Sequence, residues 1–260
     1  MLREAVEDIL AAARMRQLWL HSALADITIQ YRRSIIGPFW LTLQMALLVA
    51  ALAVLYSALF RQDIRTFLPY VAAGILVWNS ISMVTLEGCR TFIGNAPLML
   101  NTNLPLPVFA FRDVARNVIV FFHNLAAIIL IYLYFPEYLT FDLLLLVPGI
   151  ALLIVNALWV CLLLGMISAR YRDMPQMVAA LMQVAIFVTP VFWPASLIPR
   201  GMVVVHGNVF YHLIEIVRAP ILGTVPSLEN YAVVLGMTVV GWILALGAYA
   251  RYRSRIVFSL

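Results

Sequence analysis

The sequence predicts an all-α membrane protein with six transmembrane helices. The chain of 260 residues is 64% hydrophobic and 11% charged, whereas a soluble globular chain carries about 45–50% apolar and about 25% charged residues. Its mean hydropathy is +0.98, so one soluble core cannot hide all of its apolar surface. The apolar residues also gather in six long runs without Asp, Glu, Lys or Arg, and a helix crossing about 30 Å of hydrocarbon needs runs of this length.

The N-terminal region, residues 1–36, is expected to form a cytoplasmic amphipathic segment. Its apolar residues recur every three or four positions, which places them on one face of a helix. They are Leu2, Val6, Ile9, Leu10 and Ala13. Such a helix either lies in the membrane interface or packs against the cytoplasmic side of the protein itself, and the sequence leaves both possibilities open.

The six uncharged runs define the expected spans. A charge at the centre of a span costs roughly 2.5–3.5 kcal/mol on insertion scales, so its absence is a strong signal. The runs are residues 39–60, 66–86, 117–136, 143–169, 174–199 and 230–250. They belong to a single transmembrane domain that is expected to cover residues 1–260.

The arginines predict the orientation of these spans. The chain has 17 basic residues, all of them Arg. With a cytoplasmic N-terminus, thirteen of them fall on the cytoplasmic side and four on the other side, namely Arg61, Arg65, Arg200 and Arg218. Cytoplasmic loops carry the excess of basic residues, so both termini are expected in the cytoplasm.

Two connections are too elaborate to be plain loops. The cytoplasmic one, residues 90–107, is punctuated by Pro97, Pro105 and Pro107 and has room for one short helix. The external one, residues 190–226, contains five prolines and three glycines around an uncharged run at 201–214. A run of that length is too short to span, so short broken helices dipping into the outer leaflet are expected.

The sequence offers no constellation for catalysis, a cofactor or a metal. The four histidines lack the spacing of ligand pairs, and Cys89 and Cys161 form no CxxC motif. A chain without Lys cannot carry the P-loop lysine that contacts ATP phosphates. His123, inside a span with Asn124, is as well suited to a hydrogen bond between helices as to contact with a substrate.

The remaining charges also argue against some functions. Glu87 and Asp113 lie at cytoplasmic span ends near Arg112 and Arg116, where structural pairing is the favoured interpretation. A proton- or sodium-coupled carrier would need carboxylates near the membrane midplane, and the spans contain none. The basic residues are separated by apolar runs, so nucleic-acid binding is not expected.

Aromatic residues gather where several spans end on the external side. Two interpretations stay open, a belt at the lipid headgroups and a ring lining an exit path for sugars, whose C–H faces stack on aromatic rings. The candidate path residues are Tyr56, Phe60, Tyr70, Phe187, Phe192, Trp193 and Tyr211.

Several strings, in order along the chain, resemble the polysaccharide-export branch of ABC transporter permeases, which export O-antigen, capsule or teichoic acid. They are Tyr31-Arg32-Arg33-Ser34 with Gly37-Pro38-Phe39-Trp40, Leu68-Pro69-Tyr70, Arg116-Asn117 with His123-Asn124, Arg170-Tyr171-Arg172-Asp173, Thr189-Pro190-Val191-Phe192, and Tyr211-His212-Leu213-Ile214-Glu215 with Arg218-Ala219-Pro220. The sequence departs from the family at Asn208-Val209-Phe210, where the family usually has Asn-Pro, and this puts the local turn in doubt.

This resemblance implies a six-span permease domain at 37–260 that follows an amphipathic interface helix. It also implies a homodimer with two copies of a separate ATP-binding subunit, which would hold the ATP and magnesium. The short cytoplasmic helix would be the coupling helix, and the broken external helices would be periplasmic gate helices. The candidate coupling residues are Asn95, Pro97, Leu98, Met99, Leu100 and Leu104. The cargo would be a lipid-linked polysaccharide of O-antigen or capsule type that leaves across the bacterial inner membrane.

Two alternatives remain open at this stage. One is an ABC permease for drugs or lipids on the same architecture, which neighbouring glycosyltransferase genes would disfavour. The other is a membrane-embedded sugar-modifying enzyme, which would turn over a glycan without any ATPase. The sequence names neither the polymer nor its lipid carrier.

Overall fold

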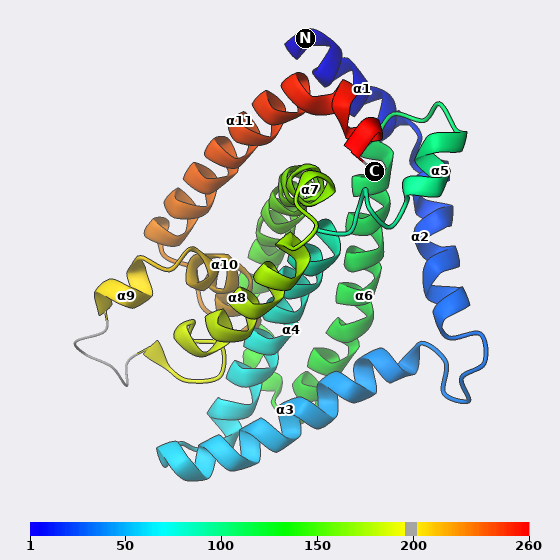
Figure 1. Cartoon of the computed structure of the whole chain (residues 1–260). Helices are drawn as coiled ribbons and strands as arrows, with labels where there is room; N and C mark the ends of the chain where they lie inside the picture. The colour runs from blue at the N-terminus through cyan, green and yellow to red at the C-terminus, as the bar shows by residue number, and fades with distance from the viewer. Residues whose placement is uncertain (196–201, 260) are drawn as a thin grey trace.

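The computed structural model describes residues 1–195 and 202–259, and within these ranges the regular structure is helical (Figure 1). The helices are α1 (Leu2–Arg14), α2 (Arg16–Gln30), α3 (Phe39–Phe60), α4 (Ile64–Gly88), α5 (Ala96–Asn101), α6 (Pro107–Tyr134), η1 (Pro136–Tyr138), η2 (Phe141–Leu145), α7 (Leu146–Arg170), α8 (Met174–Val188), α9 (Met202–His206), α10 (Val209–Ile221) and α11 (Leu228–Ser259).

Five of the described helices are long and apolar enough to cross a membrane. They are α3, α4, α6, α7 with the preceding η2, and the part of α11 up to Arg253. The prediction of an all-α, membrane-type protein is therefore confirmed. The predicted boundaries of the first span, residues 39–60, coincide with those of α3.

The fifth predicted span, residues 174–199, is the point of difference. The structure has in its place α8, an apolar helix of 15 residues. Fifteen residues at about 1.5 Å each span only about 22 Å, which is less than the hydrocarbon thickness. The helix ends at Val188, and the next residue, Thr189, has an extended backbone (ψ 135°), as expected for a residue that precedes a proline. Residues 196–199 of that prediction lie outside the described residues.

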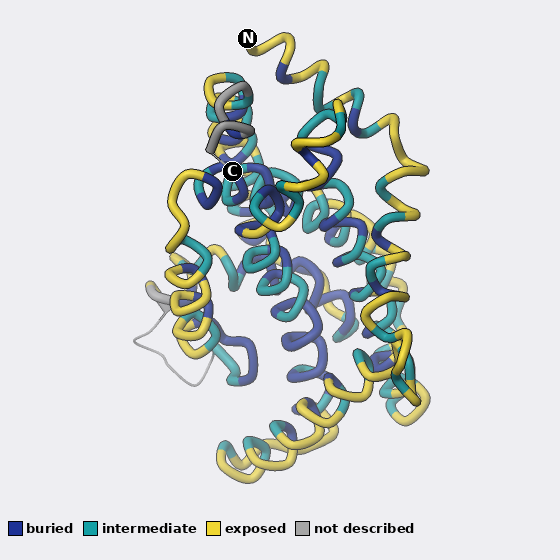
Figure 2. Tube along the Cα trace, turned by 45° about the vertical axis from the view of Figure 1, so that its right-hand side comes forward, coloured by how far each residue is buried: buried dark blue, intermediate teal, exposed yellow. Residues whose placement is uncertain are grey.

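The core of the molecule is built around α4. In the most apolar stretch of 18 residues in α4, 61% of the residues are buried, compared with 17% in the corresponding stretches of α3 and α11. The burial map in Figure 2 and the ribbon in Figure 1 place α4 in the interior, whereas α3 and α11 lie toward opposite sides of the molecule. The exposed apolar surfaces of α3 and α11 fit contact with lipid or with another chain.

The N-terminal helix α1 packs against the protein. Ala5 and Ala12 are completely buried, and Arg253 of α11 pairs with Glu4 at 2.6 Å and with Asp8 at 2.7 Å. The larger apolar residues of α1, such as Leu2 and Leu10, remain exposed. The small residues of α1 thus face the rest of the protein, and its larger apolar side chains face the surroundings. Both ends of the chain lie at the same end of the molecule (Figure 1).

Candidate functional site

Most of the candidate path residues form one aromatic cluster in the structure. Tyr56 lies 5.3 Å from Phe60 and 5.2 Å from Phe192, measured between ring centroids. Phe192 in turn lies 6.0 Å from Phe187. The cluster continues from Phe60 through Phe67 to Tyr70, with centroid distances of 6.2 and 6.3 Å. It therefore joins the end of α3, the start of α4 and the end of α8.

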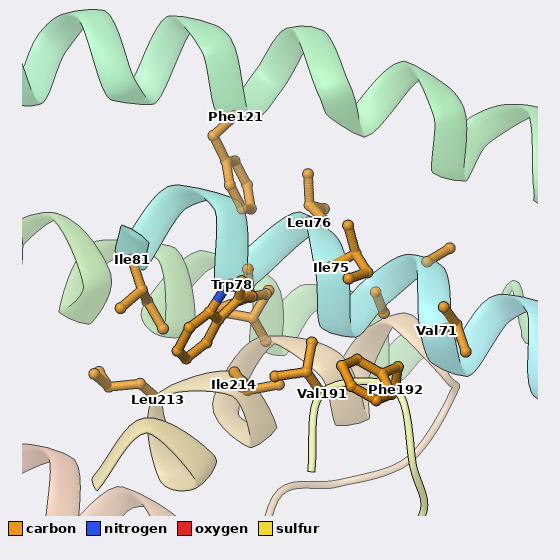
Figure 3. Packing of buried hydrophobic residues seen from close by; sticks show 14 of the residues in the cluster. Val71, Ile75, Leu76, Trp78, Ile81, Phe121, Val191, Phe192, Leu213 and Ile214 are labelled. Carbon is orange, nitrogen blue, oxygen red and sulfur yellow. The ribbon is translucent and has the colours of Figure 1, made fainter. Parts of the chain in front are cut away.

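The residues of this cluster differ in their access to the surroundings. Phe67 and Phe192 are buried at 3% and 7% exposure, whereas Phe187 is 65% exposed. A headgroup belt requires rings that face lipid, and only Phe187 of these three fits that description. Phe192 points toward the α4 core beside Val191 (Figure 3).

The turn after α8, residues 189–193, is held against α4 by its backbone. The hydroxyl of Tyr70 donates to the carbonyl oxygen of Trp193 at 3.1 Å and lies 3.4 Å from that of Pro190. The indole of Trp193 donates back to the carbonyl of Phe187 at 3.2 Å. A Cβ atom on Gly74 would collide with the backbone oxygen of Val191, so the close approach of α4 to this turn requires glycine.

Arg218 is the central polar group of this region. Its side chain is 1% exposed, donates to the carbonyl oxygen of Pro190 at 2.7 Å, and forms an ion pair with Glu215. Its guanidinium lies 4.1 Å from the centre of the Tyr70 ring, within the range of a cation–π contact. One buried cation thus connects α10, α4 and the turn after α8.

On the basis of the sequence, Arg218 is one of the four arginines expected on the external side, and no role is predicted for its side chain. A signal was nevertheless present, because Glu215 and Arg218 have the i, i+3 spacing of an ion pair on one helix face. They also interrupt a stretch otherwise rich in apolar residues, where an ionisable pair is unusual.

The broken segment before the last long helix contains α9 and α10. Asn208 caps α10 by accepting from the amide of Phe210 at 3.0 Å, and its side-chain amide donates to Thr189 at 2.9 Å. This cap forms although the family proline is absent at position 209. The short helices expected between 201 and 214 are therefore present among the described residues, although residue 201 lies outside them.

Tyr211 lies apart from the aromatic cluster. Its ring contacts His206 at 6.2 Å and His212 at 5.3 Å. His212 is fully buried between the side chain of Asn230 and the carbonyl oxygen of His206, each at 2.7 Å. Burial, helped by Glu215, raises the pKa of the Tyr211 phenol above its ordinary value. Tyr211 therefore remains a neutral hydroxyl at physiological pH.

The predicted coupling segment contains α5, which starts with proline in its first turn. Leu98 is 45% exposed and Leu100 60% exposed, and Pro97 is exposed as well. Met99, also a candidate coupling residue, is instead 6% exposed and packs in a buried cluster with residues such as Phe92. Leu104 is half-buried.

The half-buried Asn95 belongs to a charge network behind α5. Arg112 of α6 donates from Nε to Asp26 of α2 at 2.7 Å and from Nη1 to the side-chain oxygen of Asn95 at 2.8 Å. Arg116 pairs with Glu87 at 2.6 Å. The favoured interpretation of these charges as structural pairs agrees with the structure, but the participation of Asp26 was not foreseen.

His123 and the cysteines also have clear positions. His123 lies 2.7 Å from the hydroxyl of Thr42, so it connects α6 with α3 as the hydrogen-bonding interpretation expects. Cys89 and Cys161 are both buried thiols, and burial raises the pKa of Cys89. Within the part of the chain that the structure describes, no group of three or more metal-ligating side chains occurs.

Known proteins provide one informative relationship. No family model matches the chain. Over 183 residues, the chain is 23% identical to the O-antigen export system permease protein RfbA of Myxococcus xanthus, and the match covers 70% of this chain and 70% of that protein. This similarity agrees with the resemblance carried by the strings from Tyr31 to Pro220. The chain is a distant relative of an O-antigen export permease.

Proposed function

We propose that the chain is the membrane-spanning permease subunit of an ATP-driven exporter that moves a lipid-linked polysaccharide outward across the bacterial inner membrane. The similarity to RfbA is the observation that carries this proposal, since RfbA is named as an O-antigen export permease. The five long apolar helices agree with a multi-pass membrane subunit. Energy would come from two copies of a separate ATP-binding subunit, because a chain without Lys has no P-loop lysine.

The proposed topology has six crossings with both termini in the cytoplasm. The helix α8 begins just after Arg170, near the end of the molecule where Tyr252 and Ile256 also lie. It ends at the turn that contacts Tyr70, close to the opposite end of α4. The turn after α8 would therefore complete the fifth of the six crossings, and the arginine distribution supports the orientation.

Single-cysteine labelling tests this topology, in a chain whose Cys89 and Cys161 have been replaced. A cysteine in place of Gln62 should react with a membrane-impermeant reagent added from outside. A cysteine in place of Arg172 should react only after permeabilisation. Accessibility in the reverse order would contradict the proposed orientation.

The aromatic cluster is proposed to act as the outer gate of a path between two copies of the chain. Rings that pack on each other can seal a narrow path, and the same rings can stack on sugar faces without recognising a particular polymer. Replacing Phe192 and Trp193 together by Ala should then reduce surface polysaccharide or let small ions leak. Normal export with a sealed membrane would favour the headgroup belt.

The function itself is tested with the complex of this chain and the P-loop ATPase subunit that co-purifies with it from the host. In lipid nanodiscs, its ATPase activity should rise when lipid-linked polysaccharide from the host is added. Stimulation by hydrophobic drugs or phospholipids alone would favour the alternative permease function. Glycan modification by this chain without the ATPase would instead indicate an enzyme.

A further inference from the structure

The described helices form a cavity, partly open to the surroundings, that the proposed gate and coupling segment do not use. Its volume is about 270 Å³, and it lies between α4, α6, α7, α10 and α11. Its walls are mostly apolar, with contributions from Val84, Phe121, Leu153, Ala157 and Met237. All five surrounding helices are described over these residues, so the cavity belongs to a single copy of the chain.

The polar side chains in the wall are already paired. Asn117 accepts from the hydroxyl of Ser80 at 2.6 Å and donates to the Ser80 carbonyl at 3.0 Å. Asn156 donates to Thr238 at 2.8 Å and accepts from the indole of Trp159 at 2.8 Å. The hydroxyl of Thr85 donates to the carbonyl of Ile81 at 2.7 Å. The bonds of Asn117 with Ser80 and of Asn156 with Thr238 connect neighbouring helices, and the other two lie within one helix. Together they leave no polar group that calls for a ligand.

Such a cavity is poorly suited to water. A buried water typically makes about three hydrogen bonds to polar partners, and the partners in this wall are occupied. In another protein, an engineered apolar cavity of about 150 Å³ stays dry and accepts benzene. An unfilled cavity also lacks packing contacts in proportion to its size. An apolar occupant would restore those contacts without disturbing the paired amides.

We propose that this cavity binds the apolar chain of a lipid. Four of its walls are helices that qualify as membrane spans by length and composition, namely α4, α6, α7 and α11, so hydrocarbon chains are the apolar molecules present at highest concentration around it. This hydrocarbon chain can belong to a bilayer phospholipid or to the polyprenyl carrier of the cargo. The second source rests on the proposed function, whereas the first does not.

Photo-crosslinking tests the proposal directly. The full chain in complex with its ATPase is placed in nanodiscs of phosphatidylcholine that contains a diazirine in one acyl chain, and the adducts are mapped by mass spectrometry. Adducts are expected on cavity residues such as Val84 and Leu164. Adducts confined to exposed residues such as Val155 and Leu144 would overturn the proposal.

A filling variant and its matched control sharpen this test. Ala157→Phe places a ring in the cavity and should abolish the cavity adducts while the surface adducts persist. Ala151→Phe makes the same change at an exposed position of α7 and should leave both sets unchanged. Cavity adducts that survive in a well-folded Ala157→Phe protein would overturn the proposal. If Ala157→Phe does not fold, Val118→Phe on α6 replaces it.

A competition experiment distinguishes the two possible occupants, the acyl chain of a phospholipid and the polyprenyl carrier. Unlabelled polyprenyl phosphate is added to the wild-type complex before illumination. Loss of the cavity adducts would identify the carrier chain as the occupant, and their persistence would identify the phospholipid acyl chain. Either result supports a lipid site, and the second supports it even if the exporter function proves wrong.

Discussion

Arg218 and Arg112 each hold a broken segment of backbone against the end of a long helix, but in different surroundings. Arg218 is 1% exposed and bonds to the turn after α8, whereas Arg112 retains 22% side-chain exposure and bonds to Asn95 before α5. Removing a partner from a buried ion pair costs far more than removing one from a pair near water. The turn after α8 is thus fixed by a buried charge, and the segment around α5 by a more adaptable network.

Replacing Arg218 by Met should give the largest loss of stability. The change leaves the carboxylate of Glu215 and the carbonyl oxygen of Pro190 without their buried partner, which typically costs about 3–5 kcal/mol. The measurement is the thermal unfolding of the purified protein in detergent. Stability within error of the wild type would show that the buried pair does not hold this turn.

Gly74→Ala should give the next largest effect. The added methyl group collides with the backbone oxygen of Val191, and overpacking of this kind costs about 1–3 kcal/mol. Gly236→Ala on α11 is the matched control, since a Cβ there has no heavy atom within 4 Å. The control should be neutral or slightly stabilising, because Ala favours helix over Gly by about 1 kcal/mol. Equal effects of the two changes would refute the close approach of α4 to the turn.

Arg112→Gln should destabilise less than Arg218→Met. Its pair with Asp26 is partly exposed, so the expected cost of about 1–2 kcal/mol lies between the values for exposed and buried pairs. The loss should be smaller at high salt, where the wild-type pair is also screened. A cost as large as that of Arg218→Met would remove the contrast between the two regions.

Leu98→Asp should have the smallest effect on stability, within about 0.5 kcal/mol, because the side chain is 45% exposed. If α5 contacts the ATPase, the same change should nevertheless abolish ATP-dependent export. Met99→Asp is the contrasting variant, since it places a charge in a buried site and should impair folding. Normal export by the Leu98→Asp protein would count against α5 as the contact.

The helical membrane class and most span positions could be predicted because they depend on local composition. Residues 39–60 could be assigned as they are in the structure, since Pro38 precedes the apolar run and Arg61 follows it. The fifth span was extended too far because an uncharged run does not reveal the backbone break before Pro190. The extended conformation of Thr189 depends on its neighbouring proline, which the count of charges ignores.

The candidate site was predicted less completely because it depends on tertiary contacts. The aromatic residues could be named as candidates, but the turn after α8 that brings Phe192 to Tyr56 is a long-range feature that the sequence does not show. Arg218 could only be counted among the external arginines, because charge patterns cannot distinguish a loop cation from a buried, paired one. The buried position of Met99 could not be predicted, because α5 has only six residues and is too short to show a repeating pattern of apolar residues.

The contact between α1 and α11 also has a consequence for synthesis of the protein. Glu4 and its partner Arg253 are 249 positions apart, so a ribosome adding about 5–20 residues per second needs roughly 12–50 s between them. During this time the acidic side chains of α1 have no Arg253, and α1 can pack only on helices made earlier, such as α6. The contact between α1 and α11 can thus form only after all the helices between them have been synthesised.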